Sequence, residues 1–376
     1  MAPKFTMSAK KQLPVIKEPK KTKIRHGSDF TGMNTTGLAL IDLCSVSKAG
    51  CEPVNRFGCD ITKASRKFTQ FTDPPDMWFN DICTRDQATL DEYGKNLDLY
   101  AFAGPCQGFS TAGKGLGAAD PRSQLTLKSV AFIEKSQPKS FVMENVHNLL
   151  TEQKYEKILK LVCNSLKKAG YTLWMKVLNS THWVPQSRQR IYMVGIRTDV
   201  LRSESAAHGV GIWPELPTRR LITLPSVIDV ITSPQWRPHP PKNTGTQYRN
   251  VIKAYKAAKG VNPFVTPIVV DYKASERFSS SRVNEMPCLT KTRCGARGYW
   301  CSTKGGPVTI DEMALCQGFR NTQFPWREAG LSEHAAGSLL GNGQTLSLVR
   351  DLLPRVLLRA SVISYDQFVE MSNAKF

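Results

Sequence analysis

The chain has 376 residues, of which 41% are hydrophobic and 22% charged, enough apolar material for one large folded domain or two ordinary ones. Its formal net charge of +20 favours a polyanionic partner, most often nucleic acid, over an ordinary solvated basic surface. We expect no membrane helix, because the apolar runs are far shorter than about 20 residues, and no signal peptide, because no apolar region follows the basic N-terminus. The ten cysteines include no C-x-x-C pair, which argues against a disulfide scaffold or a zinc site.

The N-terminal segment, residues 1–25, is rich in Lys and Pro and has little apolar periodicity. Such a composition predicts a flexible basic tail. Contact with phosphates, a nuclear address and a purely solvated tail all fit it, and the sequence does not choose between them.

From residue 26 onward, short apolar runs alternate with helical patterns. The spacing of apolar residues predicts helices at 35–43, 123–135 and 155–170, the last stopped by Gly170, and strands at 97–102, 139–143, 171–179 and 190–196. This alternation is typical of an α/β domain with a largely parallel sheet.

The pattern changes near residue 201. From there to about residue 285, prolines are frequent and long periodic segments are few, which predicts an irregular second lobe. Helical patterns return at 310–319 and at 347–360.

Three segments place chemically active side chains next to predicted strands. AFAGPCQGFSTAG, residues 101–113, puts Cys106 after one strand, FVMENV puts Glu144 at the end of another, and VPQSRQR puts Gln186, Arg188 and Arg190 just before a third. Open α/β sheets bind ligands at such junctions, and a loop thiolate can act as a nucleophile. Taken singly, each segment has an ordinary interpretation, as a small apolar residue, a helix cap or surface charge.

Taken together, the segments resemble the cytosine-C5 methyltransferase family, which uses S-adenosyl-L-methionine. The similarity covers nearly the whole chain in the family's order: PCQ at 105–107, GLGAADPRSQL at 115–125, ENV at 144–146, QSRQR at 186–190, PCLT at 287–290 with IDEMALCQGF at 310–319, and GN at 341–342. The resemblance implies a Rossmann-like methyltransferase domain, residues 26–200 and 330–376, with a smaller target-recognition lobe at 201–329.

The resemblance also implies roles for the reactive residues. Cys106 would attack C6 of a cytosine flipped out of DNA, which makes C5 nucleophilic. Glu144 would contact N3, Arg190 would contact O2, and Arg188 would lie nearer the phosphate or the thiol. Three further residues would contact the substrate: Gln107, Ser110 and Gln186. One family proline is missing before the cysteine, at Gly104.

The cofactor site is expected at the turn GSDFTGMNTTGLAL, residues 27–40, which resembles the family's first motif with departures. Asn34 and Thr35 replace the usual paired glycines, and the acidic residue, Asp29, stands one place later than expected. Phe30 would stack on adenine, Asp60 would bind ribose hydroxyls and Asp81 the adenine amino group. The full set of expected cofactor contacts is Phe30, Gly32, Asp60, Ile61, Asp81, Ile82 and Asn342.

Two other functions remain open at this stage. A related branch of the superfamily methylates tRNA, but the loop reads GFS at 108–110 rather than that branch's Cys-Phe-Thr, which favours DNA over RNA. A nucleic-acid-binding homologue without catalysis would explain only the altered first motif. We expect no metal and no membrane contact, an undetermined oligomeric state, and a nuclear location if the source is eukaryotic or a cytoplasmic one otherwise.

Overall fold

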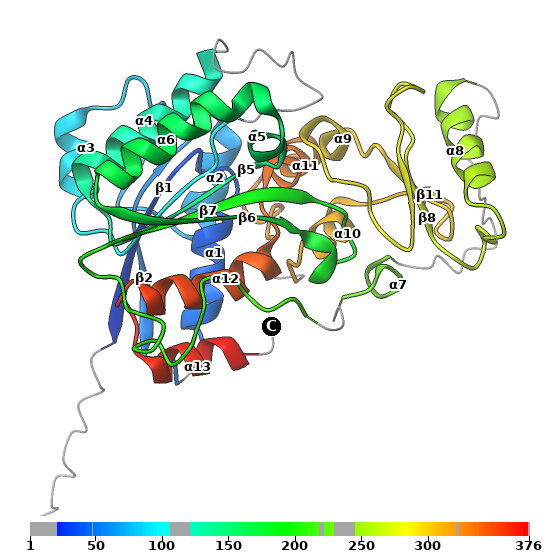
Figure 1. The fold of residues 1–376 in the computed structure, drawn as a ribbon. Coiled ribbons are helices and arrows are strands. Elements are labelled where there is room, and N and C mark those ends of the chain that lie inside the picture. The colour runs from blue at the N-terminus through cyan, green and yellow to red at the C-terminus, as the bar shows by residue number, and fades with distance from the viewer. Residues whose placement is uncertain are drawn as a thin grey trace, which may run out of the picture.

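The structure is a computed structural model that describes residues 21–46, 48–105, 121–217, 222–228, 245–320 and 323–374. It consists of a large α/β domain and a smaller lobe beside it (Figure 1). The predicted fold class, a mostly parallel sheet with a second smaller lobe, is confirmed. No helix in the described ranges is long and apolar enough to cross a membrane.

The large domain is built on a seven-stranded sheet in the order β3-β2-β1-β4-β5-β7-β6. Its strands are β1 (Thr22–Asp29), β2 (Cys51–Cys59), β3 (Met77–Phe79), β4 (Leu99–Phe102), β5 (Ser140–Val146), β6 (Tyr171–Asn179) and β7 (Gln189–Arg197). Strand β7 pairs antiparallel with both of its neighbours, and the pairs among the first five strands are parallel. The short connection between β6 and β7 explains this, because parallel neighbours need a longer crossover.

Helices cover both faces of the sheet (Figure 1). The helices of the large domain are α1 (Thr35–Cys44), α2 (Lys63–Thr72), α3 (Gln87–Tyr93), α4 (Pro121–Ser136), α5 (Asn148–Thr151), α6 (Glu156–Lys168), α10 (Ile310–Leu315), α11 (Glu333–Asn342), α12 (Leu346–Arg359) and α13 (Tyr365–Asn373). Helices α4 and α6 bury their apolar side chains in one core, while α1 and α12 bury theirs in a second core across the sheet.

The helices and strands expected from apolar spacing are present. The strand at 171–179 has the predicted bounds, and α6 lies within 155–170, followed by Gly170 at φ +89°. The N-terminal boundary differs, because β1 begins at Thr22, so residues 22–25 of the expected tail belong to the sheet. Backbone pairing with β2, which the sequence pattern does not reveal, orders them.

The smaller lobe contains a four-stranded antiparallel sheet in the order β11-β10-β8-β9, with α8 packed against it. Its elements are α8 (Thr246–Ala257), β8 (Ile268–Asp271), β9 (Ser281–Val283), α9 (Lys291–Gly295), β10 (Tyr299–Cys301) and β11 (Gly306–Pro307); the short α7 (Leu224–Val227) precedes them. Val251, Val270 and Trp300 form part of its own small core.

The ends of the segment expected to form this lobe, 201–329, pack elsewhere. Val210 and Leu224 near its start, and Met313 near its end, bury their side chains in the core of the large domain. The residues that pack around the lobe's own core therefore come from a shorter range, 251–300.

Candidate active site

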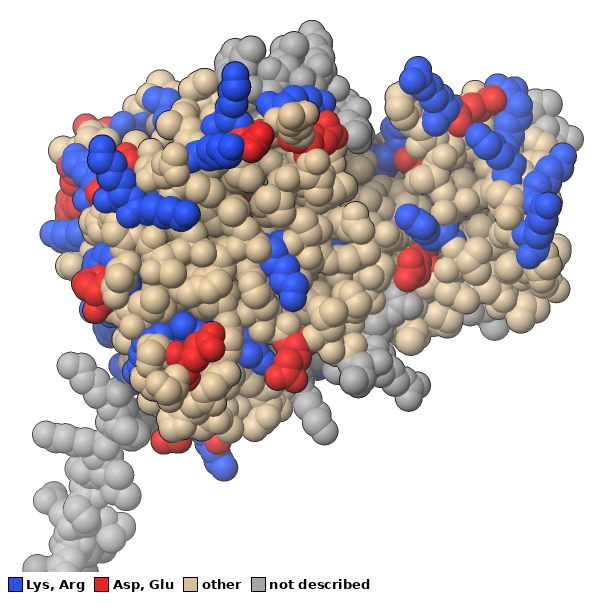
Figure 2. All heavy atoms as spheres, in the orientation of Figure 1, with Lys and Arg blue, Asp and Glu red and all other residues tan. Residues whose placement is uncertain are grey.

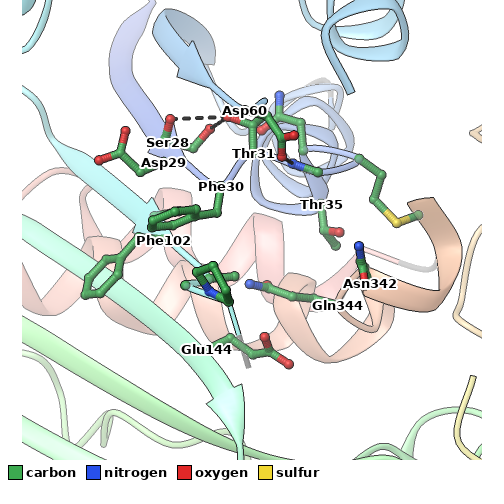
Figure 3. A pocket seen from close by; sticks show the side chains of 18 of the residues that line it. Ser28, Asp29, Phe30, Thr31, Thr35, Asp60, Phe102, Glu144, Asn342 and Gln344 are labelled. Atoms are coloured by element: carbon green, nitrogen blue, oxygen red, sulfur yellow. Dashed lines mark hydrogen bonds between the residues drawn. The ribbon is translucent and has the colours of Figure 1, made fainter. Parts of the chain in front are cut away.

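A single cavity lies at the carboxyl ends of β1, β2, β4 and β5, where open α/β sheets bind ligands. The residues predicted for the cofactor all line it: Phe30, Gly32, Asp60, Ile61, Asp81, Ile82 and Asn342. Glu144, Arg188 and Arg190 line it as well. Figure 3 shows Asp60 and Glu144 on opposite sides of the cavity, with Phe30 between them and Asn342 at one edge.

Three predicted residues, Cys106, Gln107 and Ser110, lie outside the described residues. The chain that leads to them is described, and its last residues, Gly104 and Pro105, line the cavity. The side-chain amide of Asn145 donates a hydrogen bond of 3.2 Å to the carbonyl oxygen of Gly104. Asn145 was not among the predicted residues, although it follows Glu144 in the ENV segment that drew attention to this strand.

The loop between β1 and α1 has an unusual backbone. Phe30, Gly32 and Asn34 all have a left-handed conformation, with φ of +54°, +56° and +51°. Apart from glycine, asparagine is among the residues that adopt it most readily. Asn34, in place of a family glycine, therefore keeps a backbone shape that glycine would also permit.

The side chain of Asn34 adds contacts that a glycine lacks. Its oxygen accepts a hydrogen bond from the backbone of Gly37 at 3.3 Å and caps the start of α1. Its nitrogen donates to a buried carboxylate oxygen of Asp73 at 2.7 Å, and Asn55 donates to the same oxygen at 3.0 Å. The altered motif thus fastens the loop to the end of α2.

Asp60 holds the same loop from the other side. One carboxylate oxygen accepts from the backbone of Gly32 at 3.0 Å, and the other accepts from the backbone and hydroxyl of Thr62 at 2.8 Å each. Beside it, Ile61 has 78% of its surface exposed while it lines the cavity, an unusual position for a large apolar side chain. Such a residue offers a flat apolar ligand a surface to cover.

Asp29 does not hold the loop as Asp60 does. It is buried beneath the loop, where it accepts hydrogen bonds from Arg85 and Tyr100 at 2.5 Å each. Burial, together with the negative charge of Asp29, raises the pKa of the Tyr100 hydroxyl well above its ordinary value, so Tyr100 remains a neutral donor. The acidic residue displaced by one position therefore supports the floor of the cavity.

Glu144 and Arg190 meet at the other end of the cavity. Glu144 is 5% exposed, and its Oε1 lies 3.0 Å from Nε of Arg190. The antiparallel register pairs Val146 with Arg190, which brings the start of β7 to the carboxyl end of β5. The strand direction thus explains why a carboxylate and a guanidinium distant in sequence share one site.

Arg188 is buried and joins three segments. Its Nη1 donates to the carbonyl oxygens of Leu289 at 2.8 Å and Gly341 at 3.5 Å. Its side chain forms part of the cavity wall, but these hydrogen bonds direct its Nη1 toward backbone carbonyl oxygens. Gln344, which the sequence analysis did not select, also lines the cavity, and its buried Oε1 has no hydrogen-bond partner among the described atoms.

The expected substrate contact of Gln186 is not supported by its position. The side chain is fully buried and is absent from the cavity lining. Its nitrogen donates to the carbonyl of Cys316 at 3.1 Å, and its oxygen accepts from the backbone of Leu289 at 3.3 Å. Because both ends of the amide form hydrogen bonds inside the protein, the Gln186 side chain links Cys316 and Leu289.

Within the described residues, no group of three or more His, Cys, Asp or Glu side chains could hold a metal ion.

Comparison with known proteins agrees with this geometry. The chain is 35% identical over 156 residues to the type II methyltransferase M.NgoBI of Neisseria gonorrhoeae, covering 41% of this chain and 46% of that protein. It is 37% identical over 147 residues to M.HaeII of Haemophilus aegyptius, covering 39% and 44%. The matched segments thus span less than half the length of these curated relatives.

Solved structures share the fold. The methyltransferase EhMeth of Entamoeba histolytica superposes with a TM-score of 0.59 at 14% identity, covering 89% of this chain and 98% of that one. Residues 60–353 match the family described as C-5 cytosine-specific DNA methylase, a range that includes Glu144 and both arginines but begins after the loop at Phe30. Because this match covers well over half of the sequence, the chain belongs to the C-5 cytosine-specific DNA methylase family.

Proposed function

We propose that this chain is a DNA (cytosine-5-)-methyltransferase that takes its methyl group from S-adenosyl-L-methionine. The observation that carries the proposal is the single cavity, which unites all the expected cofactor contacts with Glu144 and Arg190. Family membership supports the same reaction. The cavity therefore brings the residues expected to bind a methyl donor and a methyl acceptor to one place, which a methyl transfer requires.

The residues at the β1 and β2 end suit the cofactor. Exposed Ile61 and the ring of Phe30 offer apolar surface to adenine, and Asp60 and Asp81 offer acceptors to ribose hydroxyls and an amino group. The amide oxygen of Gln344, which has no hydrogen-bond partner among the described atoms, offers one more acceptor. When bound, S-adenosyl-L-methionine supplies an electrophilic methyl group on a sulfonium.

The residues at the β5 and β7 end suit the base. In the proposed reaction, the Cys106 thiolate adds to C6 of cytosine and makes C5 electron-rich. Glu144 holds or protonates N3, and Arg190 spreads the negative charge at O2. After C5 has accepted the methyl group and a base such as water has taken its proton, Cys106 leaves and the aromatic ring is restored.

DNA is the proposed partner. The chain is strongly basic, and Figure 2 shows Lys and Arg side chains gathered on the smaller lobe over α8. Exposed members on and just after this helix are Arg249, Lys253, Lys256 and Lys259. A base stacked in a duplex cannot be attacked on its face, so the target cytosine must be flipped out. The bacterial sources of M.NgoBI and M.HaeII favour the cytoplasm over the nucleus.

The test is transfer of labelled methyl groups from S-adenosyl-L-methionine to duplex DNA, single-stranded DNA and total tRNA in parallel. We expect label in DNA as 5-methylcytosine and none with the Cys106→Ala variant, which should still bind cofactor and DNA. DNA binding should weaken steeply with salt, because phosphate contacts release counterions.

Two outcomes would contradict the proposal. Label confined to tRNA would keep the chemistry and replace the polymer. No label in any substrate, with no cofactor binding by calorimetry, would leave a nucleic-acid-binding homologue without catalysis.

A further inference from the structure

A second cysteine lies between the two arginines of the site. The Sγ of Cys288 is 3.7 Å from Nη1 of Arg188 and 3.7 Å from Nη2 of Arg190. The backbone around it is fixed, because the carbonyl oxygen of Cys288 accepts from the Tyr299 hydroxyl at 2.8 Å and the carbonyl of Leu289 accepts from Arg188. The mechanism proposed above does not use this thiol.

The charge of Arg188 is buried beside Cys288. Arg188 is 3% exposed, and no carboxylate of the described residues lies within ion-pair distance of it. Its Nε is buried without a hydrogen-bond partner among the described atoms. Arg190, by contrast, pairs with Glu144, whose Oε1 lies 3.0 Å from its Nε. An uncompensated buried charge is strongly destabilising, and a thiolate at Cys288 would offset the charge of Arg188.

The surrounding groups favour that ionised form. Burial raises the pKa of the Cys288 thiol, but attraction to Arg190 and Arg188 and their hydrogen bonds outweigh it, so the pKa lies below its ordinary value. Two further titratable residues that interact with Cys288 are Cys294 of α9 and Tyr299 of β10. Burial raises the pKa of both, so they stay neutral where Cys288 ionises.

We infer that Cys288 is a thiolate that anchors Arg188 and Arg190 and thereby positions Arg190 between Glu144 and the target base. The role is that of a positioning residue, since the sulfur acts through the arginines. This inference rests on the proposed function for its effect on catalysis, but the ionisation of the thiol can be measured without any turnover.

The first experiment follows alkylation of the Cys106→Ala protein by iodoacetamide as a function of pH, with each cysteine quantified by peptide mass spectrometry. Cys163 is the internal control, because it is also partly exposed and burial raises its pKa. We expect the rate at Cys288 to reach half its maximum below about pH 8.5 and that at Cys163 above it. A midpoint for Cys288 at or above that of Cys163 would overturn the inference, whether or not the protein methylates DNA.

The second experiment compares kcat of wild type and Cys288→Ser across the pH range. Serine is neutral throughout. Ionisation of Cys106 is common to both proteins and therefore cancels in the ratio of the wild-type kcat to the Cys288→Ser kcat. We expect this ratio to rise from near one at low pH to about ten once Cys288 has ionised, with Cys288→Asp recovering part of the loss. A ratio that does not change with pH indicates a purely structural side chain and refutes the positioning role.

Discussion

The two ends of the cavity, the proposed cofactor end at β1 and β2 and the proposed base end at β5 and β7, differ in how closely they follow the sequence motifs of the family. At the cofactor end, the loop from Phe30 to Asn34 departs from the family motif and lies outside the family match, yet it enters α1 through the same left-handed turn that glycine would allow. At the base end, Glu144 and Arg190 keep the residue types of the family and are joined by an ion pair across two strands.

The difference follows from what each end has to provide. A turn must provide a backbone path and a few hydrogen bonds, and Asn34 supplies both by another route. In the proposed reaction, the base end must provide a carboxyl group and a guanidinium at fixed places, and no other side chain has the same proton affinity and shape. Sequence departures are therefore tolerated at the first end and should be costly at the second.

The largest effect is expected at the base end. Glu144→Gln keeps the shape of the side chain but cannot protonate N3, so methyl transfer should fall by about 100-fold or more. Cofactor affinity should stay within about twofold, because Glu144 is across the cavity from Asp60. Single-turnover rates and calorimetry measure the two quantities separately. Glu156→Gln on α6, which removes an exposed pair with Lys160, is the matched control and should behave as wild type.

An unchanged rate in Glu144→Gln would remove that residue from the chemistry. A parallel loss of cofactor affinity would contradict the separation of the two ends, since it would mean that the cavity responds as one unit. Thermal unfolding of both variants distinguishes either result from a general loss of structure.

Local signals explain how much of the site was predictable. Asp60, Ile61, Asp81 and Ile82 were placed by motif order, a local property of the sequence, and the structure puts them just after β2 and β3, where they line the cavity. The fold class and the strand at 171–179 were predictable for the same reason, because apolar spacing is a local property.

Long-range packing explains the rest. Gln186 has its partners at Leu289 and Cys316, about a hundred residues or more away, and the QSRQR pattern alone does not reveal that it is used internally. Cys288 reaches the arginines by the same kind of contact. The packing of Val210 into the core of the large domain was not predictable either, since irregular, proline-rich sequence says nothing about which core it joins.

A smaller effect is expected from Asn34 at the cofactor end. Asn34→Ala removes the cap of α1, leaves buried Asp73 with one donor fewer and forces alanine to φ +51°, so the free energy of unfolding should fall by about 2–3 kcal/mol. Asn34→Gly removes the same side chain without the backbone strain and should lose about 1 kcal/mol less. Urea unfolding of both variants measures the difference. Equal losses would mean that the side chain, and not the backbone conformation, accounts for asparagine at this position.

The smallest effect is expected from Ile61, and it tests whether the cofactor end binds by apolar contact. Ile61→Ala should weaken binding of S-adenosyl-L-methionine by about 5- to 30-fold, equivalent to about 1–2 kcal/mol of lost apolar burial. The free energy of unfolding should not change, because 78% of this side chain is exposed without ligand. Phe71→Ala is the control, since Phe71 is 52% exposed on the neighbouring helix α2 but does not line the cavity. If both variants bind the cofactor as wild type does, Ile61 is an ordinary surface residue, and affinity at this end must come from Phe30 and from the polar contacts of Asp60 and Asp81. If only Ile61→Ala weakens binding while its methyl-transfer rate at saturating cofactor stays unchanged, the two ends of the cavity work independently, one for affinity and one for chemistry.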